Sequence, residues 1–178
     1  RLDDRDFRAA GETGKGIPSQ KPSDAKNHIF ESDRKIDKSY RKYLEGKDIN
    51  RYVVQWQNRW LKYGPNLAAQ RDPDLFDGKR LLFRRIVGDR LIGVYTDEDF
   101  VTSQLLQIVK PNSQFSAEYL LGVLNSTLMA YYFKKKYNRQ EKTFPEIRIY
   151  ELASLPIKNS LAMHDKLASA VHQMLSLN

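Results

Sequence analysis

Cysteine is absent from this chain of 178 residues, which excludes a disulfide framework and any zinc site built on thiolates. Its histidines, His28, His164 and His172, have neither metal-ligand nor catalytic-triad spacing. No apolar run approaches the roughly 18 residues of a membrane span, and no signal peptide opens the sequence. Arg1 is not an initiator methionine, which favours a fragment of a longer protein. These absences fit a protein of a reducing compartment, with no membrane among its partners.

Positive charge is in surplus, with 30 Lys and Arg against 22 Asp and Glu, a formal net charge of +8. Such a surplus attracts nucleic acid or another anionic surface, because binding releases counterions. Many basic proteins bind neither, so the charge alone does not decide between these partners. The hydrophobic fraction of 40% is typical of a globular protein with a real core.

The composition predicts three segments along the chain. Residues 1–37 are polar, contain scattered Gly and Pro, and are predicted to form an arm or linker. Residues 38–158 are predicted to form the folded domain. In residues 159–178, Leu161, Ala168, Val171 and Met174 recur at helical spacing, which predicts an amphipathic helix. This helix can pack on its own domain or dock on a neighbouring one, and its position favours the second.

Strand patterns fill the first half of the predicted domain. Residues 49–56 are rich in β-formers, and residues 66–71 are interpreted as a short helix. Residues 80–87 and 91–95 flank Gly88-Asp89-Arg90, a typical hairpin turn, and a third strand is expected over 100–109. Another strand is expected over 144–150.

The segment Ser116–Asn138 predicts the central helix. Leu120, Leu124, Leu128 and Tyr131 recur on one helical face, with Ser116 as the N-cap. Asn125-Ser126 interrupts the segment with residues that favour caps over helix interiors, so we expect a break there. The predicted fold class is therefore α+β: a mixed or antiparallel sheet packed against a central broken helix, with a C-terminal amphipathic helix.

Cationic side chains follow this helix and nominate the contacts to an anionic partner. Lys134, Lys135 and Lys136, at 100° per residue, cannot all face one way, and part of the run can instead complement the helix C-terminus. The loop after them carries side chains that recognise guanine and adenine edges or bind phosphate, unless they are simply solvated. Its candidates are Asn138, Arg139, Gln140 and Lys142.

Two further groups of residues combine with these cations. Arg84 and Arg85 are neighbours on one strand and point to opposite faces, so the one nearer the helix needs a carboxylate partner or the sheet margin. Trp56, Trp60 and Tyr63 lie beside Arg59 and Lys62. Aromatic and cationic side chains interleaved in this way can stack on bases, but Trp is more often part of a core and Arg of a solvated edge.

Four motifs follow one another in a fixed order along the chain. They are Tyr43–Ile49 with Tyr52, Lys79–Ile86, Tyr119–Ser126, and Phe144–Ile149 with Leu155–Ile157. Together they resemble the TaqI-like C-terminal specificity domain, and the resemblance covers about residues 40–157. This is the target recognition domain of N6-adenine DNA methyltransferases and of type IIG restriction-modification enzymes.

The resemblance implies recognition of double-stranded DNA in a bacterial or archaeal cytoplasm. It carries over no base-reading residue, so Arg84, Arg85 and the basic residues named above are candidates on the ground of their charge and position. It implies a methyltransferase domain in the same polypeptide, which would bind S-adenosylmethionine and flip the target adenine. This chain has no Asn-Pro-Pro-Tyr or Asp-Pro-Pro-Tyr tetrapeptide, and no glycine-rich cofactor loop, so we expect a non-catalytic module without a cofactor. A protein-interaction module is the alternative, and a stand-alone enzyme is poorly supported.

Overall fold

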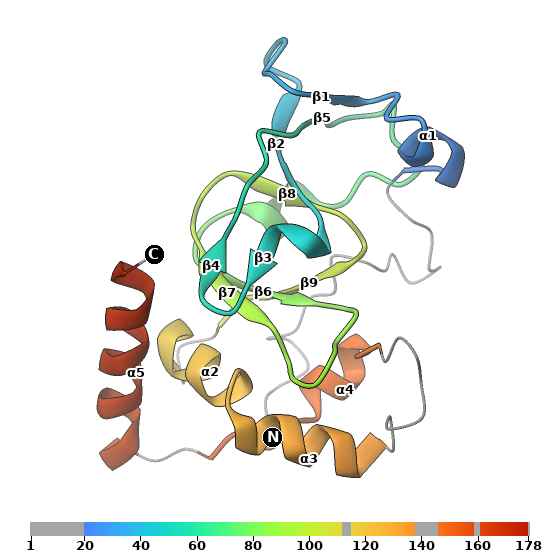
Figure 1. Ribbon diagram of the computed structural model, residues 1–178. Coiled ribbons are helices and arrows are strands. Elements are labelled where there is room, and N and C mark those ends of the chain that lie inside the picture. Colours follow the sequence, from blue (N-terminus) through green and yellow to red (C-terminus); the bar gives the residue numbers. More distant parts are fainter. Residues whose placement is uncertain (1–19, 112–114, 138–145, 159–160, 178) are drawn as a thin grey trace.

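Three tiers of secondary structure make up the computed structural model, which describes residues 20–111, 115–137, 146–158 and 161–177. In Figure 1 a four-stranded sheet lies at the top, a three-stranded sheet in the middle and most of the helices beneath it. The predicted α+β class is confirmed. None of the helices in the described ranges is long and apolar enough to span a membrane.

The upper sheet has the strand order β1-β5-β2-β8. Strand β2 pairs antiparallel with β5 and parallel with β8, so this sheet is mixed. Between β2 and β5 the expected long strand over 49–56 is two short strands, because Tyr52 adopts a φ of 67° and turns the chain. The bounds are β1 Glu31–Ser32, β2 Tyr40–Leu44, β3 Ile49–Asn50, β4 Val53–Val54, β5 Trp60–Lys62 and β8 Phe100–Thr102.

The central sheet has the order β7-β6-β9 and is antiparallel throughout. Strands β6 (Arg80–Arg84) and β7 (Gly93–Thr96) form the predicted hairpin, and β9 (Leu106–Val109) pairs with the other edge of β6. The expected single strand over 100–109 was wrong. The chain turns at Ser103, whose carbonyl accepts a hydrogen bond from the Leu106 amide at 3.2 Å, so β8 and β9 lie in different sheets.

The central helix is broken where the sequence predicted it, into α2 (Ala117–Leu124) and α3 (Thr127–Tyr137). The Ser116 hydroxyl caps α2 by accepting from the Tyr119 amide at 3.1 Å. The predicted apolar stripe holds for α2 only. Because the break changes the helical phase, Leu128 and Tyr131 are exposed, whereas Met129, Ala130 and Phe133 are the buried side chains of α3.

Asn125 joins the break in the helix to the sheet. Its amide nitrogen donates to the Gly93 carbonyl at 2.9 Å, and its amide oxygen accepts from the Gly93 N–H at 2.8 Å. The side chain is fully buried, and it satisfies both backbone groups of Gly93 as a neighbouring strand would. The residue that ends α2 therefore also fixes the position of β7.

Two helices follow α3. The strand expected over 144–150 was wrong for residues 147–150, because only Glu146 forms a β-bridge, with Ile86, and α4 spans Ile149–Ala153. Residues 144–145 lie outside the described residues. The Glu151 carboxylate caps the start of α4 by accepting from the Arg148 amide at 2.8 Å. Helix α5 (Leu161–Ser176) was predicted, and it packs on α2 at Gly122. A Cβ at Gly122 would lie 2.9 Å from Leu167 Cγ, so the small residue permits the close approach. Docking of α5 on another domain stays a prediction.

The remaining expectations concern the N-terminal arm and a loop. Residues 1–19 lie outside the described residues, and residues 20–37 contain α1 (Pro22–Lys26) and β1, which pairs with β5. The short helix expected over 66–71 is not formed, because the chain turns there and a 3-10 helix, η3 (Pro73–Phe76), follows. A second 3-10 turn, η2 (Gly46–Asp48), links β2 to β3. The predicted three-segment division stays a prediction.

Candidate nucleic-acid interface

Arg84 and Arg85, both predicted to contact DNA, make internal contacts. The Arg84 guanidinium donates to the Ile49 carbonyl and, at 3.1 Å, to Asn50 Oδ1. Burial lowers the pKa of Arg84, and the charge of Asp48 opposes this shift. The Arg85 Nε and Nη2 atoms lie 3.2 and 3.1 Å from Glu146 Oε2, so Arg85 has the carboxylate partner that its strand position called for. A role for either residue in DNA binding stays a prediction.

The three lysines at the end of α3 contact three different neighbours. Lys134 forms an ion pair with Asp89 at 3.0 Å. Lys135 lies 5.8 Å from the Tyr131 ring centre, and Lys136 lies 5.5 Å from that of Tyr132. Such surface contacts are worth about 0.5–1 kcal/mol, little enough for a polyanion to displace. The lysines therefore diverge as the helical spacing predicted, and Lys135 and Lys136 are exposed.

Asn138, Arg139, Gln140 and Lys142 all lie in residues 138–145, outside the described residues. Their assignment to bases, phosphates or solvent stays a prediction.

The turn of the β6–β7 hairpin adds a cation that the prediction did not include. We define the hairpin tip as Gly88, Asp89 and Arg90, which are all exposed. The tip lies beside α3, because Lys134 hydrogen-bonds Asp89 and thereby lowers the pKa of that carboxyl. The turn that carries Arg90 is predictable from Gly88-Asp89-Arg90, but a turn sequence does not indicate that its arginine is available to a ligand.

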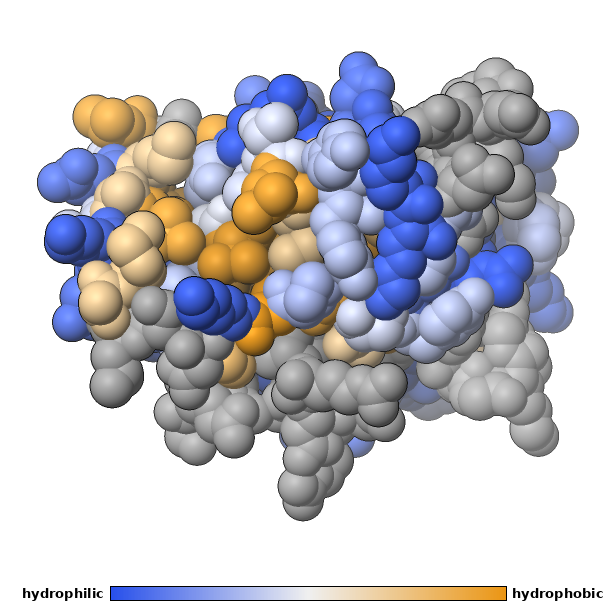
Figure 2. Space-filling model, turned by 90° about the horizontal axis from the view of Figure 1, so that it is seen from below, coloured by the Kyte–Doolittle hydropathy of each residue, from blue (hydrophilic) through white to orange (hydrophobic). Residues whose placement is uncertain are grey.

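We define the basic end of the molecule as the hairpin tip together with Lys134, Lys135, Lys136 and Arg148. Arg148 is exposed just before α4, and its guanidinium donates to the Tyr150 hydroxyl at 3.3 Å. Figure 2 shows the molecule from below: hydrophobic side chains gather in the middle of this face, beside a strongly hydrophilic band. Leu128 and Tyr131 of α3 are among the exposed apolar side chains of the protein, 77% and 61% exposed.

The tryptophans lie at the opposite end, on the upper sheet. Trp60 pairs across the sheet with Lys42, and Trp56 packs edge-on against Trp60 and Phe100, with centroids 5.4 and 6.1 Å apart. The Trp56 indole donates to the Arg59 carbonyl at 2.9 Å. Both rings are half-buried. Trp56 and Trp60 therefore pack over the core of the upper sheet, and part of each ring remains exposed to solvent.

Arg59, the cation next to these rings, belongs to a buried ionic cluster. Its guanidinium donates to the carboxylates of Glu45 and Asp48, and the Asp48 side chain is only 1% exposed. Burial by itself would raise the pKa of Glu45, but the hydrogen bond and charge of Arg59, with a contribution from Lys47, lower it. The Arg59 guanidinium is therefore engaged in internal ion pairs that stabilise the fold.

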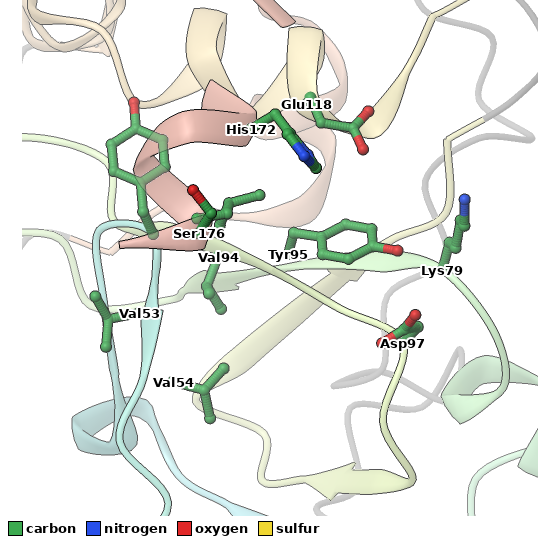
Figure 3. A pocket seen from close by; sticks show the side chains of 11 residues that line it. Val53, Val54, Lys79, Val94, Tyr95, Asp97, Glu118, His172 and Ser176 are labelled. Carbon is green, nitrogen blue, oxygen red and sulfur yellow. The ribbon is translucent and has the colours of Figure 1, made fainter. Parts of the chain in front are cut away.

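An open pocket of about 570 Å³ lies where α5 approaches β7 and the β3–β4 hairpin (Figure 3). His172 and Glu118 line its helical side, and Tyr95 lines its strand side. Burial, then the charges of Asp97 and Glu118, raise the pKa of Tyr95. The Ser176 hydroxyl donates to the Gln173 carbonyl at 2.8 Å, so its proton is not directed at His172. Within the described ranges, no three potential metal ligands come together.

Comparison with known proteins identifies the family to which the chain belongs. The family model described as the TaqI-like C-terminal specificity domain matches residues 41–157, more than half of the chain. A predicted type II restriction enzyme and methyltransferase of Methanocaldococcus jannaschii is 30% identical over 133 residues. The match covers 71% of this chain but only 11% of that relative.

Proposed function

Because the chain belongs to the TaqI-like C-terminal specificity domain family, we propose that it recognises a DNA sequence on behalf of an N6-adenine DNA methyltransferase or a type IIG restriction-modification enzyme. The chain itself would be non-catalytic. A methyltransferase domain of the same polypeptide would bind S-adenosylmethionine and modify the adenine. The family match over residues 41–157 is the observation that carries this proposal.

The basic end is the surface that best supports DNA binding. Its cations project from three elements that approach one another, the β6–β7 hairpin, α3 and the start of α4. In the described residues, Asp89 is the exposed carboxylate of this group, and Lys134 neutralises it. A surface with this balance attracts phosphates, and the net charge of +8 strengthens the attraction over longer distances.

A binding experiment with salt and sequence as variables tests the proposal. The chain would be mixed with a pool of randomised DNA duplexes, and bound duplexes would be sequenced. We expect enrichment of one sequence, and an affinity that falls steeply between about 50 and 200 mM salt. An affinity that is equal for all sequences would contradict recognition, and absence of binding would contradict the function itself.

Exposed apolar side chains on α3 and α5 favour a second candidate, a protein-interaction module. Leu128 is 77% exposed, Met163 57% and Met174 45%. Scattered apolar exposure is normal, but these residues occupy the two helices that border the hydrophobic area of Figure 2. Binding to a separately produced methyltransferase domain that is insensitive to salt, without enrichment of any DNA sequence, would support this candidate over the first.

A further inference from the structure

The hairpin tip is a short projection that is fixed at its base by two buried side chains. Val87 and Leu91, which flank it, are each 1% exposed and belong to the core under the central sheet. The Arg84 amide donates to the Ile92 carbonyl at 2.9 Å, which continues the hairpin beyond β6 and β7. The turn can therefore bend little relative to the sheet.

A second set of bonds holds the hairpin from its other side. The Arg85 amide donates to the Leu105 carbonyl, and the Arg85 carbonyl accepts from the Ile147 amide, both at 2.8 Å. Ile86 forms a β-bridge with Glu146, whose carboxylate pairs with the Arg85 side chain. Thus the segment that leads to the tip is tied both to the start of β9 and to the residues before α4.

Charge and shape at the tip leave one cation available for a ligand. Asp89 is neutralised by Lys134, and Gly88 has no side chain; a Cβ there would meet nothing within 4 Å. Arg90 is exposed, and within the described ranges it forms no hydrogen bond or ion pair. A rigid backbone that presents a free guanidinium is the preorganisation that a recognition contact requires.

We propose that Arg90 recognises a guanine in the DNA major groove, an inference that rests on the proposed function of this chain. A two-stranded β-ribbon fits the major groove, which is about 12 Å wide, and arginine pairs with guanine O6 and N7 through two parallel hydrogen bonds. The exposed lysines of α3 lie next to the tip and can contact the flanking phosphates. Arg90 would then determine one base pair of the sequence.

Two substitutions at Arg90 separate base recognition from charge. Arg90→Lys keeps the positive charge but loses the planar fork, and Arg90→Ala loses both. Arg34→Ala is the matched control, an exposed arginine close to the upper sheet, at the other end of the molecule. Each variant of the full chain would be tested with the randomised duplex pool and with the enriched sequence. Circular dichroism melts would verify folding.

We expect both Arg90 variants to lose preference at a single G·C pair and keep preference at the other positions. Affinity for the enriched sequence should fall about 5- to 150-fold, whereas Arg34→Ala should match the parent chain. A loss that is equal for all sequences in Arg90→Ala and absent in Arg90→Lys would overturn the inference, because Arg90 would then contact phosphate. Unchanged preference in both variants would overturn it too. If the parent chain itself enriches no sequence, the proposed function fails instead.

Discussion

The arginines of the two sheets and the cations of the basic end differ in what they contact. Arg59 meets two carboxylates, and Arg80, which is fully buried, donates to the carbonyls of Gly78, Glu98 and Phe100. At the basic end, Arg90 and Lys135 are exposed. Cationic side chains in the sheets thus stabilise the fold through internal bonds. Those at the basic end are accessible to a ligand. Charge substitutions should therefore reduce stability in the sheets and DNA affinity at the basic end.

The largest effect should come from Arg59→Ala. The substitution leaves the buried carboxylate of Asp48 without its cationic partner. Breaking a buried ion pair in this way typically lowers the free energy of unfolding by about 3–5 kcal/mol. Urea unfolding followed by circular dichroism would measure the change. Lys135→Ala, at the basic end, should stay within about 0.5 kcal/mol of the parent chain. Equal losses of stability in the two variants would contradict the idea that cations stabilise the fold in the sheets but not at the basic end.

Asn125→Ala should have the next largest effect, about 2–3 kcal/mol. The substitution leaves two buried backbone groups of Gly93 without the Asn125 partner, although the Gly93 carbonyl still accepts from Tyr52. The free energy of unfolding would again be measured in urea. Gln173→Ala removes an exposed amide from α5 and should change it by less than about 0.5 kcal/mol. A loss near zero for Asn125→Ala would show that the bonds between Asn125 and Gly93 do not contribute to stability.

The role of Asn125 shows which parts of the fold the sequence could predict. Local preferences placed the helix break, because Asn and Ser compete for backbone hydrogen bonds wherever they stand. Two other local signals, a turn sequence and apolar residues at helical spacing, predicted the β6–β7 hairpin and α5. They could not predict that Asn125 bonds Gly93, because the two residues are 32 positions apart and nothing local links them. The Leu128 stripe failed for a related reason, since the break altered the helical phase beyond it.

The candidate site was predictable to a lesser extent. The lysines of α3 were identified from their sequence alone, and their divergence follows from helical geometry. The internal partners of Arg84 and Arg85 come from β3 and from the segment before α4, so their contacts depend on tertiary packing. Arg90 could not be predicted as a contact, because a turn sequence indicates backbone conformation and does not indicate which turns project toward a ligand.

The ionic cluster in the upper part of the molecule should also make stability depend on acid. The pKa of Glu45 is lowered below its ordinary value of 4.5 in the folded chain. The unfolded chain therefore binds more protons as the pH falls past 4.5, so the contribution of Glu45 is fully present above that pH and declines below it. Glu45→Gln should cost about 1 kcal/mol at pH 7 and flatten the curve of unfolding free energy between pH 5 and pH 3.

Urea unfolding at several pH values would measure this, and Glu118→Gln offers a matched control, because no described residue forms an ion pair with that carboxylate. If the control flattened the curve as much as Glu45→Gln, acid sensitivity would not belong to the cluster around Arg59.

The smallest effect on stability should come from the double variant Lys135→Ala with Lys136→Ala. Both side chains are exposed, and each contact to a tyrosine ring contributes only about 0.5 kcal/mol, so the free energy of unfolding should change by no more than about 1 kcal/mol. Affinity for DNA should nevertheless fall on every sequence. Each lost phosphate contact makes the slope of log affinity against log salt less negative by about 0.9.

Salt titrations of DNA binding distinguish phosphate contacts made by Lys135 and Lys136 from a general attraction by the net charge of the protein. Lys26→Ala with Lys166→Ala removes the same charge from exposed positions on α1 and α5, so it controls for the overall field of the protein. A slope that changes equally in both double variants would mean that net charge alone attracts DNA, whichever residues carry it. A slope that changes only at Lys135 and Lys136 would place phosphates against α3, next to the hairpin tip.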